Sequence, residues 1–358
     1  MRADLALVGF GHVGRRFARL IEERRDWLAL DYDLDCRVVG IATRHHGAVY
    51  RDSGIDAVAM AVNVEGGRPI VEPGIEAADS FEVIRRLGAS EAPIKVVIET
   101  TTLDINAGQP AIDHVRAALQ VGCHVATANK GPTAFAYEEL SVLADDRGRS
   151  FLFEGAVMDG VPIFNLVRET LPAVQVTGFR GVLNSTTNHI LSALEDGDSF
   201  DAALQRMQAL GIAEADPSLD VDGWDAAAKT SALANVLMRA RMTPQAVDRE
   251  GIGPATARLA MAARSRGARV RLVASASSTP RGVVTSVRPI ELPETDLLAG
   301  LRGMANALVL QTDLLGEIAI CQLSGSLTQT AYALLSDLVT IRRRLPPVPH
   351  AAAPGRNP

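Results

Sequence analysis

Short apolar runs alternate with amphipathic segments over the first 155 residues of the chain. The apolar runs at 5–9, 36–42, 94–99, 124–127 and 150–154 predict buried strands. Apolar residues three and four positions apart at 13–21, 81–87, 111–119 and 134–145 predict helices, and residues 63–78 predict loops. Strands that alternate with helices are typical of an α/β unit with a right-handed, doubly wound parallel sheet.

A second pattern begins after residues 154–162, where two glycines and a proline predict a sharp turn between two units. Strands are predicted at 174–183, 269–275, 283–291, 308–312 and 318–323. Helices are predicted after the polar cap at 184–188, at 204–210 up to Gly211, from 223–224 onward, and at 297–304 and 327–342. Residues 344–358 predict a disordered tail.

A glycine-rich turn joins the first predicted strand to the first predicted helix. Gly9, Gly11 and Gly14 form the pattern G-x-G-x-x-G. Such a turn exposes backbone N–H groups at a helix N-terminus, which suits a dinucleotide pyrophosphate. The alternative is a glycine turn that only lets the helix and the strand pack closely, but its place at the first strand favours cofactor binding.

The end of the second strand bears on the choice of cofactor. A site that prefers NAD usually places a carboxylate there for the ribose 2′-hydroxyl, whereas this chain has Thr43, Arg44, His45 and His46. A positive charge favours a 2′-phosphate, and therefore NADP, with Arg44 as the clamp. The alternatives are a solvated Arg44 and the use of NAD.

Polar residues follow two further predicted strands. Thr100, Thr101 and Thr102 come after the strand at 94–99, and Lys130 follows the strand at 124–127. The carboxyl ends of parallel strands border the ligand crevice, so these residues are expected on the cofactor side.

Residues 211–230 hold five carboxylates and end near Lys229. The chain has only three lysines, Lys95, Lys130 and Lys229, among 36 basic residues. Lysine can exchange a proton near neutral pH where arginine cannot, so Lys130 and Lys229 are candidates for catalysis. Asp225 and Lys229 lie four residues apart on one face of a predicted helix. They form either a surface ion pair or two side chains that reach into one site.

Composition narrows the class of protein. A chain of 358 residues predicts two domains, and a net charge of −6 argues against nucleic acid as a partner. No apolar run is long enough to span a membrane, and the start of the chain has no secretory pattern. The three separated cysteines fit neither a disulfide framework nor a zinc site. A cytoplasmic protein is expected.

Over roughly residues 4–343 the chain resembles homoserine dehydrogenase. The matching motifs are G-F-G-x-V-G at 9–14, T-A-N-K at 127–130, E-x-x-V-x-x-G-x-P at 154–162, G-V-L-N-x-T-T-N at 181–188, and A-E-A-D-P followed by D-V-x-G-x-D-A-A-x-K at 213–229. The last motif is long and charged, so a chance match is improbable.

The resemblance implies a Rossmann domain over residues 1–155 that binds NADP, and an α+β domain with a mixed sheet over 156–310 for substrate binding and dimerisation. A C-terminal helix at about 311–343 is implied to pack back onto the first domain. The implied substrate is the amino acid homoserine, oxidised to aspartate 4-semialdehyde in threonine and methionine biosynthesis, and the implied assembly is a homodimer. No regulatory domain is expected after the catalytic part.

The resemblance also implies residue roles. Lys229 would act as general acid and base, with its pKa lowered by Lys130 or by burial. Glu214 and Asp225 would hold the substrate, and Lys130 would lie near the nicotinamide. The cofactor contacts would be Gly9, Phe10, Gly11, His12, Val13, Gly14, Arg44, Thr100, Thr101 and Lys130. Glu154, Val157, Asp159 and Val161 would bind a monovalent cation such as sodium, mostly through backbone carbonyls.

Two departures from the family pattern leave alternatives open. The turn at 157–160 has larger residues than the family pattern, and residues 322–326 replace a glycine-rich segment. A paralogue that oxidises another amino or hydroxy acid is one alternative. A protein that binds NADP without catalysis is the other, although the presence of both Lys130 and Lys229 argues against it.

Overall fold

A computed structural model describes residues 1–70, 74–209 and 216–346 of the protein. The first of its two sheets has seven strands in the order β4-β3-β2-β1-β5-β6-β7. The strands are β1 (Arg2–Val8), β2 (Asp35–Ala42), β3 (Ala48–Tyr50), β4 (Glu76–Ala77), β5 (Ile94–Glu99), β6 (His124–Thr127) and β7 (Phe151–Leu152). The five strands from β2 to β7 are parallel, which confirms the predicted parallel sheet. β3 and β4 add an antiparallel edge, and β4 lies within residues 63–78, which were predicted to form loops.

The first unit also contains seven helices within the described ranges, several of which bury the apolar positions that predicted them. They are α1 (His12–Glu23), α2 (Arg25–Tyr32), α3 (Ala57–Glu65), α4 (Ser80–Gly88), α5 (Ala111–Gln120), α6 (Gly131–Phe135) and α7 (Tyr137–Asp146). In α1, the buried side chains include Phe17, Leu20 and Ile21. The helix predicted at 134–145 is two helices, because the backbone at Ala136 departs from helical geometry. The sequence of α3 is apolar on nearly all sides, so periodicity did not identify it.

The second sheet has the strand order β13-β12-β8-β10-β11-β9. Its strands are β8 (Val176–Val182), β9 (Asp248–Arg249), β10 (Ala268–Thr279), β11 (Gly282–Pro293), β12 (Asn306–Thr312) and β13 (Gly316–Gln322). Only β9 and β11 pair in parallel, so the sheet is mixed, as expected. The helices of this unit are α9 (Ser185–Glu195), α10 (Phe200–Ala209), α11 (Ser218–Val221), α12 (Trp224–Met238) and α13 (Pro254–Arg264).

The helix predicted at 297–304 is wrong, because this segment forms a series of turns. Its leucines have helical spacing, but Gly300 and Gly303 interrupt the segment, and Gly303 adopts a φ of +60°. Leu298 and Leu301 instead pack with Val273 of β10 in a small apolar cluster on one face of the second sheet. Burial of these side chains against the sheet replaces burial along a helix face.

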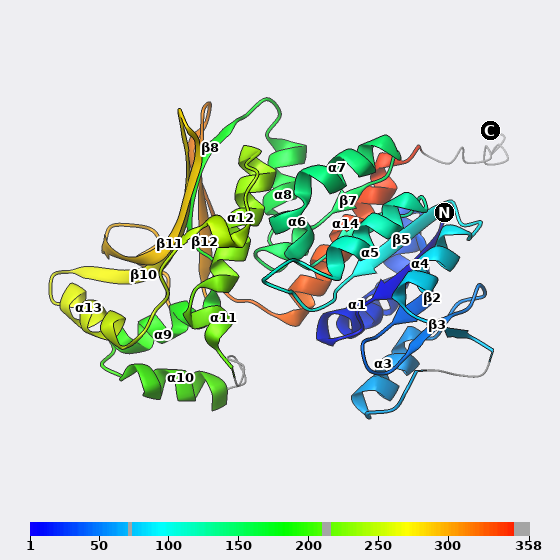
Figure 1. Cartoon of the computed structure of the whole chain (residues 1–358), viewed down its shortest axis with the longest axis horizontal. Helices are drawn as coiled ribbons and strands as arrows, with labels where there is room; N and C mark the ends of the chain where they lie inside the picture. Colours follow the sequence, from blue (N-terminus) through cyan, green and yellow to red (C-terminus); the bar gives the residue numbers. More distant parts are fainter. Residues whose placement is uncertain (71–73, 210–215, 347–358) are drawn as a thin grey trace, which may run out of the picture.

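The chain crosses between the units twice. The first crossing contains the 3₁₀ turn η1 (Glu154–Ala156), α8 (Ile163–Asn165) and the π-helix η2 (Leu166–Thr170). The second leads from β13 to α14 (Leu327–Arg344), which lies beside α1 in Figure 1 and packs against it. α14 begins at Leu327 rather than near 311, because residues 306–322 form the hairpin of β12 and β13. No helix within the described ranges is both long and apolar enough to cross a membrane.

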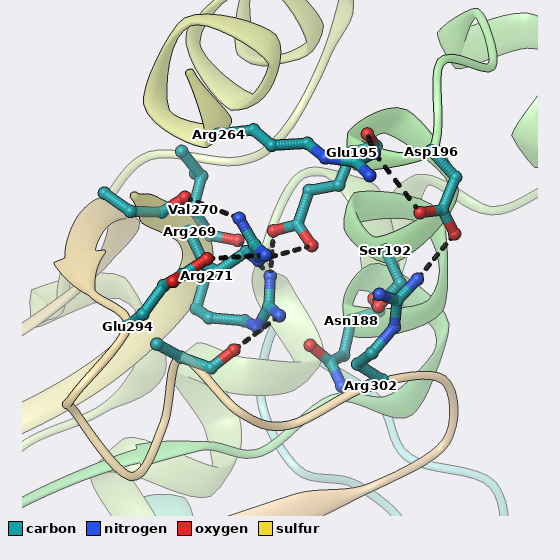
Figure 2. A network of polar contacts seen from close by, with 12 residues as sticks. Asn188, Ser192, Glu195, Asp196, Arg264, Arg269, Val270, Arg271, Glu294 and Arg302 are labelled. Atoms are coloured by element: carbon teal, nitrogen blue, oxygen red, sulfur yellow. Dashed lines mark hydrogen bonds and ion pairs between the residues drawn. The ribbon is translucent and has the colours of Figure 1, made fainter. Parts of the chain in front are cut away.

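A buried ion-pair network lies at the C-terminal end of α9 (Figure 2). Arg271 of β10 is 0% exposed and pairs with the carboxylate of Glu195, which is 1% exposed. Arg271 also donates to the carbonyls of Val270 and Ala299 at 2.8 Å each. Arg269 lies 3.6 Å from the second Glu195 oxygen and 2.7 Å from Glu294. The network therefore joins α9, β10 and the turns at 294–302.

Candidate active site

The glycine-rich turn lies against the loop after β5. A Cβ on Gly9, which has a φ of +85°, would lie 2.6 Å from backbone atoms of Thr100 and Thr101. A Cβ on Gly14 would lie 2.6 Å from the carbonyl oxygen of Gly9, to which the Thr100 hydroxyl also donates at 2.6 Å. Glycine is therefore required at both positions by close approach of the backbone.

Gly11 differs from these two glycines, because a Cβ there would meet no atom of the described residues within 4 Å. It is the N-cap of α1, and no side chain caps that helix end. Unoccupied donors beside open space at a helix N-terminus fit the pyrophosphate of a dinucleotide. The structure thus brings the glycine turn and Thr100 together.

The turn after β2 carries Arg44 at the predicted place. Thr43 holds the turn, since its hydroxyl donates to the Gly47 carbonyl at 2.9 Å and accepts from the His46 amide at 2.7 Å. Arg44 is exposed and makes no hydrogen bond or ion pair with any other described residue.

The loops after β5 and β6 are joined by a buried polar ring. Glu99, the last residue of β5, is 0% exposed, and its Oε1 accepts from the Thr101 amide at 2.9 Å. Its Oε2 accepts from the Thr127 hydroxyl at 2.7 Å. The Thr127 hydroxyl accepts from the Asn129 amide at 3.0 Å, and the Asn129 side chain donates to the Thr101 carbonyl at 2.9 Å. No pattern in the sequence marks Glu99 or Asn129 as part of such a ring.

Lys130 and Lys229 converge on one carboxylate. Lys229 Nζ lies 2.9 Å from Asp225 Oδ2, and Lys130 Nζ lies 3.3 Å from Asp225 Oδ1. Lys229 also donates to the carbonyl of Leu183 at 2.6 Å. The side chains of Lys229, Asp225 and Lys130 are 14%, 17% and 22% exposed, so this is not the surface pair that spacing alone suggests.

Asn184 and Asp220 complete the cluster, and sequence reasoning assigned neither of them to it. The Asn184 amide donates to Asp220 Oδ1 at 2.6 Å and to Asp225 Oδ2 at 3.0 Å, while its oxygen caps α9. Asn184 lies 36 residues before Asp220 in the chain, so no local signal identified the pair. Asp216 instead accepts from the Ser218 amide, and Glu214 lies outside the described residues.

Burial and charge act in opposite directions on these groups. Burial disfavours the charged forms of Asp225 and Lys229, but their mutual attraction outweighs it. The pKa of Asp225 is therefore lowered, with Lys130 contributing, and the pKa of Lys229 is raised. This corrects the expectation of a lowered Lys229 pKa. Burial and the neighbouring Asp225 raise the pKa of Asp220.

The turn predicted to hold a cation has both carboxylates engaged by protein donors. Glu154 accepts from the amides of Phe164 and Asn165 at 2.9 and 2.7 Å. Asp159, at a φ of +47°, accepts from Gln322 Nε2 and the Thr330 hydroxyl at 2.9 Å each. Within the described ranges no cluster of three His, Cys, Asp or Glu side chains fits a metal.

This combination of a dinucleotide-type sheet edge and a cluster of lysines and carboxylates defines an NAD(P)-dependent oxidoreductase that acts on a CH–OH group. Residues 9–154 match the model of the homoserine dehydrogenase NAD-binding domain, and residues 162–339 match that of homoserine dehydrogenase. The chain belongs to the homoserine dehydrogenase family.

Individual relatives agree over nearly the whole chain. The NAD(+)-dependent homoserine dehydrogenase of Pseudomonas canavaninivorans is 36% identical, covering 95% of this chain and 96% of the relative. The homoserine dehydrogenase of Methanocaldococcus jannaschii is 34% identical, covering 94% of this chain and 98% of the relative. The crystal structure of a putative homoserine dehydrogenase from Archaeoglobus fulgidus has a TM-score of 0.83 at 30% identity, over 95% of this chain and 99% of that one. The structure of a hyperthermophilic archaeal homoserine dehydrogenase in complex with NADPH has a TM-score of 0.77 at 28% identity. The match covers 97% of this chain and 99% of that one.

Proposed function

We propose that this protein interconverts L-homoserine and L-aspartate 4-semialdehyde, with Lys229 as the proton carrier. The observation that carries the proposal is the position of Lys229, whose ammonium lies between Asp225 Oδ2 and the Leu183 carbonyl, with Lys130 on the other oxygen of Asp225. Two ammonium groups flank the one carboxylate of Asp225, so N–H donors of both lysines lie where an alkoxide would form.

The raised pKa of Lys229 assigns the protonated form as the resting state. In the reduction of the semialdehyde, Lys229 donates its proton to the oxygen of the forming alcohol while Asp225 keeps the ammonium oriented. In the oxidation of homoserine, Lys229 must first lose that proton. The nicotinamide cofactor, when bound, accepts or supplies the hydride.

Substrate binding is proposed for Glu214 and Asp225. The α-ammonium of homoserine requires buried acceptors, and both are carboxylates on the acidic segment that precedes or begins α12. Lys130, with Asp225 as its ion-pair partner among the described residues, keeps N–H donors for an anionic group of the substrate.

NADP is the proposed cofactor, held by the turn at 9–14, by Thr100 and Thr101, and by Arg44 at the 2′-phosphate. The exposed, unpaired guanidinium of Arg44 supports this choice over NAD. One relative is named NAD(+)-dependent and another structure contains NADPH, so both cofactors need to be compared.

Three further assignments belong to the same proposal. A sodium-like cation is held by the turn containing Glu154, Val157, Asp159 and Val161, mostly through carbonyl oxygens. The protein works as a cytoplasmic homodimer in threonine and methionine biosynthesis. Exposed apolar side chains on the outer strands and adjoining turns of the second sheet support self-association, with Val284, Leu315 and Leu323 between 53% and 82% exposed.

The test is turnover of the purified protein with NADP and a panel of hydroxy and amino acids. Formation of NADPH with L-homoserine, and at least a hundredfold less with the other compounds, is expected. Faster turnover of another hydroxy acid would favour a paralogue. Tight NADP binding with no turnover of any compound would favour a non-catalytic protein.

A further inference from the structure

Glu99 is a buried carboxyl group to which the mechanism assigns no role. It ends β5, the strand that lies between β1 and β6 in the first sheet. Among the described residues it has no ion-pair partner, and its neighbours are neutral donors. Burial raises its pKa, against the effect of the hydrogen bonds from Thr101 and Thr127. A buried carboxyl group without a cation is costly, which calls for an explanation.

The direction of the hydrogen bonds shows how Glu99 connects two loops. The Thr101 amide can only donate, so Oε1 must accept from it. The Thr127 hydroxyl accepts from the Asn129 amide and therefore has its own proton available for Oε2. Both oxygens of Glu99 thus act as acceptors, one for each loop.

The loop on the β6 side carries Lys130. Asn129, next to Lys130, is held by the Thr127 hydroxyl and by the Thr101 carbonyl, and its own side-chain oxygen accepts from the Gly131 amide at 2.8 Å. Lys130 is the N-cap of α6, so its Cα is fixed by the residues on both sides. The loop on the β5 side touches the glycine turn through Thr100.

We propose that Glu99 is a positioning residue for hydride transfer, which sets the place of Lys130 relative to the cofactor loops through Thr101, Thr127 and Asn129. This inference rests on the role proposed above for Lys130. Glu99 touches neither Lys130 nor Asp225, and it acts only through this ring of hydrogen bonds.

The first experiment replaces Glu99 with glutamine. The amide of Glu99→Gln presents N–H donors where an oxygen accepted, so one of the two loops loses its acceptor. We expect kcat and kcat/KM for homoserine to fall together by at least tenfold, because Lys130 is displaced at the reacting centre. The Kd of NADP, measured by fluorescence, is expected to stay within threefold, and cofactor titration counts the folded sites.

Two substitutions of Thr127 change the structure less and test the proposal even if Glu99→Gln does not fold. Thr127→Val removes the hydroxyl at nearly constant volume and is expected to match the Glu99→Gln loss. Thr127→Ser keeps the hydroxyl and is expected to stay within threefold of the wild type. The kcat of the double variant Glu99→Gln/Thr127→Val is expected to lie within threefold of that of the less active single variant, because both substitutions break the same ring of hydrogen bonds.

Asp4 provides the matched control. It is a buried carboxylate in the same sheet, 1% exposed, but lies near the start of β1 and is held by Arg37 and Ser90. Asp4→Asn is expected to lower the thermal midpoint while kcat stays within twofold.

Several outcomes would overturn the inference. One is a kcat for Glu99→Gln within twofold of the wild type while Lys130→Ala is strongly impaired. Others are equal activity of Thr127→Val and Thr127→Ser, or a loss of NADP affinity as large as the loss of turnover. If Lys130→Ala itself turns over homoserine normally, the role proposed for Lys130 fails and this inference fails with it.

Discussion

The two ends of α9 hold charged clusters that differ in burial and in the type of cation. At its N-terminal end, Asn184 orients Asp225 beside Lys229 and Lys130, and these charged side chains are 14% to 22% exposed. At its C-terminal end, Arg271 and Glu195 are almost fully buried, and Arg271 also donates to two backbone carbonyls (Figure 2). In the first cluster two lysines flank the Asp225 carboxylate, whereas in the second a fully buried arginine pairs with a buried glutamate.

The difference separates a group that can react from one that can only stabilise. Arg271 cannot lose its proton and has few donors left for a ligand. Lys229 can exchange a proton, and partial exposure leaves room for a substrate beside it. The lysine cluster is therefore expected to control the rate, and the buried Arg271–Glu195 pair to control the stability.

The largest expected effect is the loss of turnover when Lys229 is replaced. Lys229→Ala removes the proton carrier, and kcat for homoserine is expected to fall on the order of 10³-fold while NADP affinity stays within threefold. Lys229→Arg keeps the charge but cannot release a proton, so it should be about as inactive in steady-state assays. Lys95→Ala is the control, because Lys95 donates to the Gly88 carbonyl far from the cluster. An active Lys229→Arg enzyme would contradict proton transfer by Lys229.

Arg271→Ala tests the other end of α9. It leaves Glu195 buried without its main partner, so the free energy of unfolding is expected to fall by about 3–5 kcal/mol in urea denaturation. Arg302→Ala breaks the exposed pair with Asp196 in the same network and is expected to cost less than about 1 kcal/mol. A change in kcat per folded enzyme above twofold in either variant would show that the two ends of α9 are not independent.

The pH dependence of the two directions sharpens the assignment of Lys229. A raised pKa keeps Lys229 protonated below its ordinary value of 10.5, and its neutral form grows about tenfold with each pH unit in that range. Homoserine oxidation, which needs the neutral form, is expected to rise about a hundredfold in kcat between pH 7 and 9. Semialdehyde reduction, which needs the protonated form, should stay flat. An oxidation plateau near pH 7 would place the pKa below its ordinary value.

The smallest expected effect concerns Arg44, an arginine without the partners that Arg271 has. Arg44→Ala is expected to raise the KM for NADP about tenfold and the KM for NAD less than twofold, because only NADP carries the 2′-phosphate. Steady-state kinetics with both cofactors measure the ratio. Equal increases for both cofactors would remove Arg44 from the proposed phosphate site.

The sequence by itself determined the elements whose signal is local. Apolar runs placed β1, β2, β5 and β6 within a few residues, because a strand buried on both faces needs them. Close backbone approach requires glycine at Gly9 and Gly14, so the turn could be identified before its structure was known. The scarcity of lysine singled out Lys130 and Lys229, both of which lie in the cluster.

Only the tertiary structure decided what these residues meet. The N-terminal end of α9 brings Asn184 to Asp220 of α11 and to Asp225 of α12, and these contacts join residues 36 and 41 positions apart without a local pattern. The direction of the Lys229 pKa depends on the balance between burial and the nearby carboxylate, which spacing does not reveal. Glu99 looked like the ordinary end of a strand until the loops on either side were seen to donate to it. Local sequence encodes which segments are buried, whereas the pairing of polar groups depends on distances that only the folded chain sets.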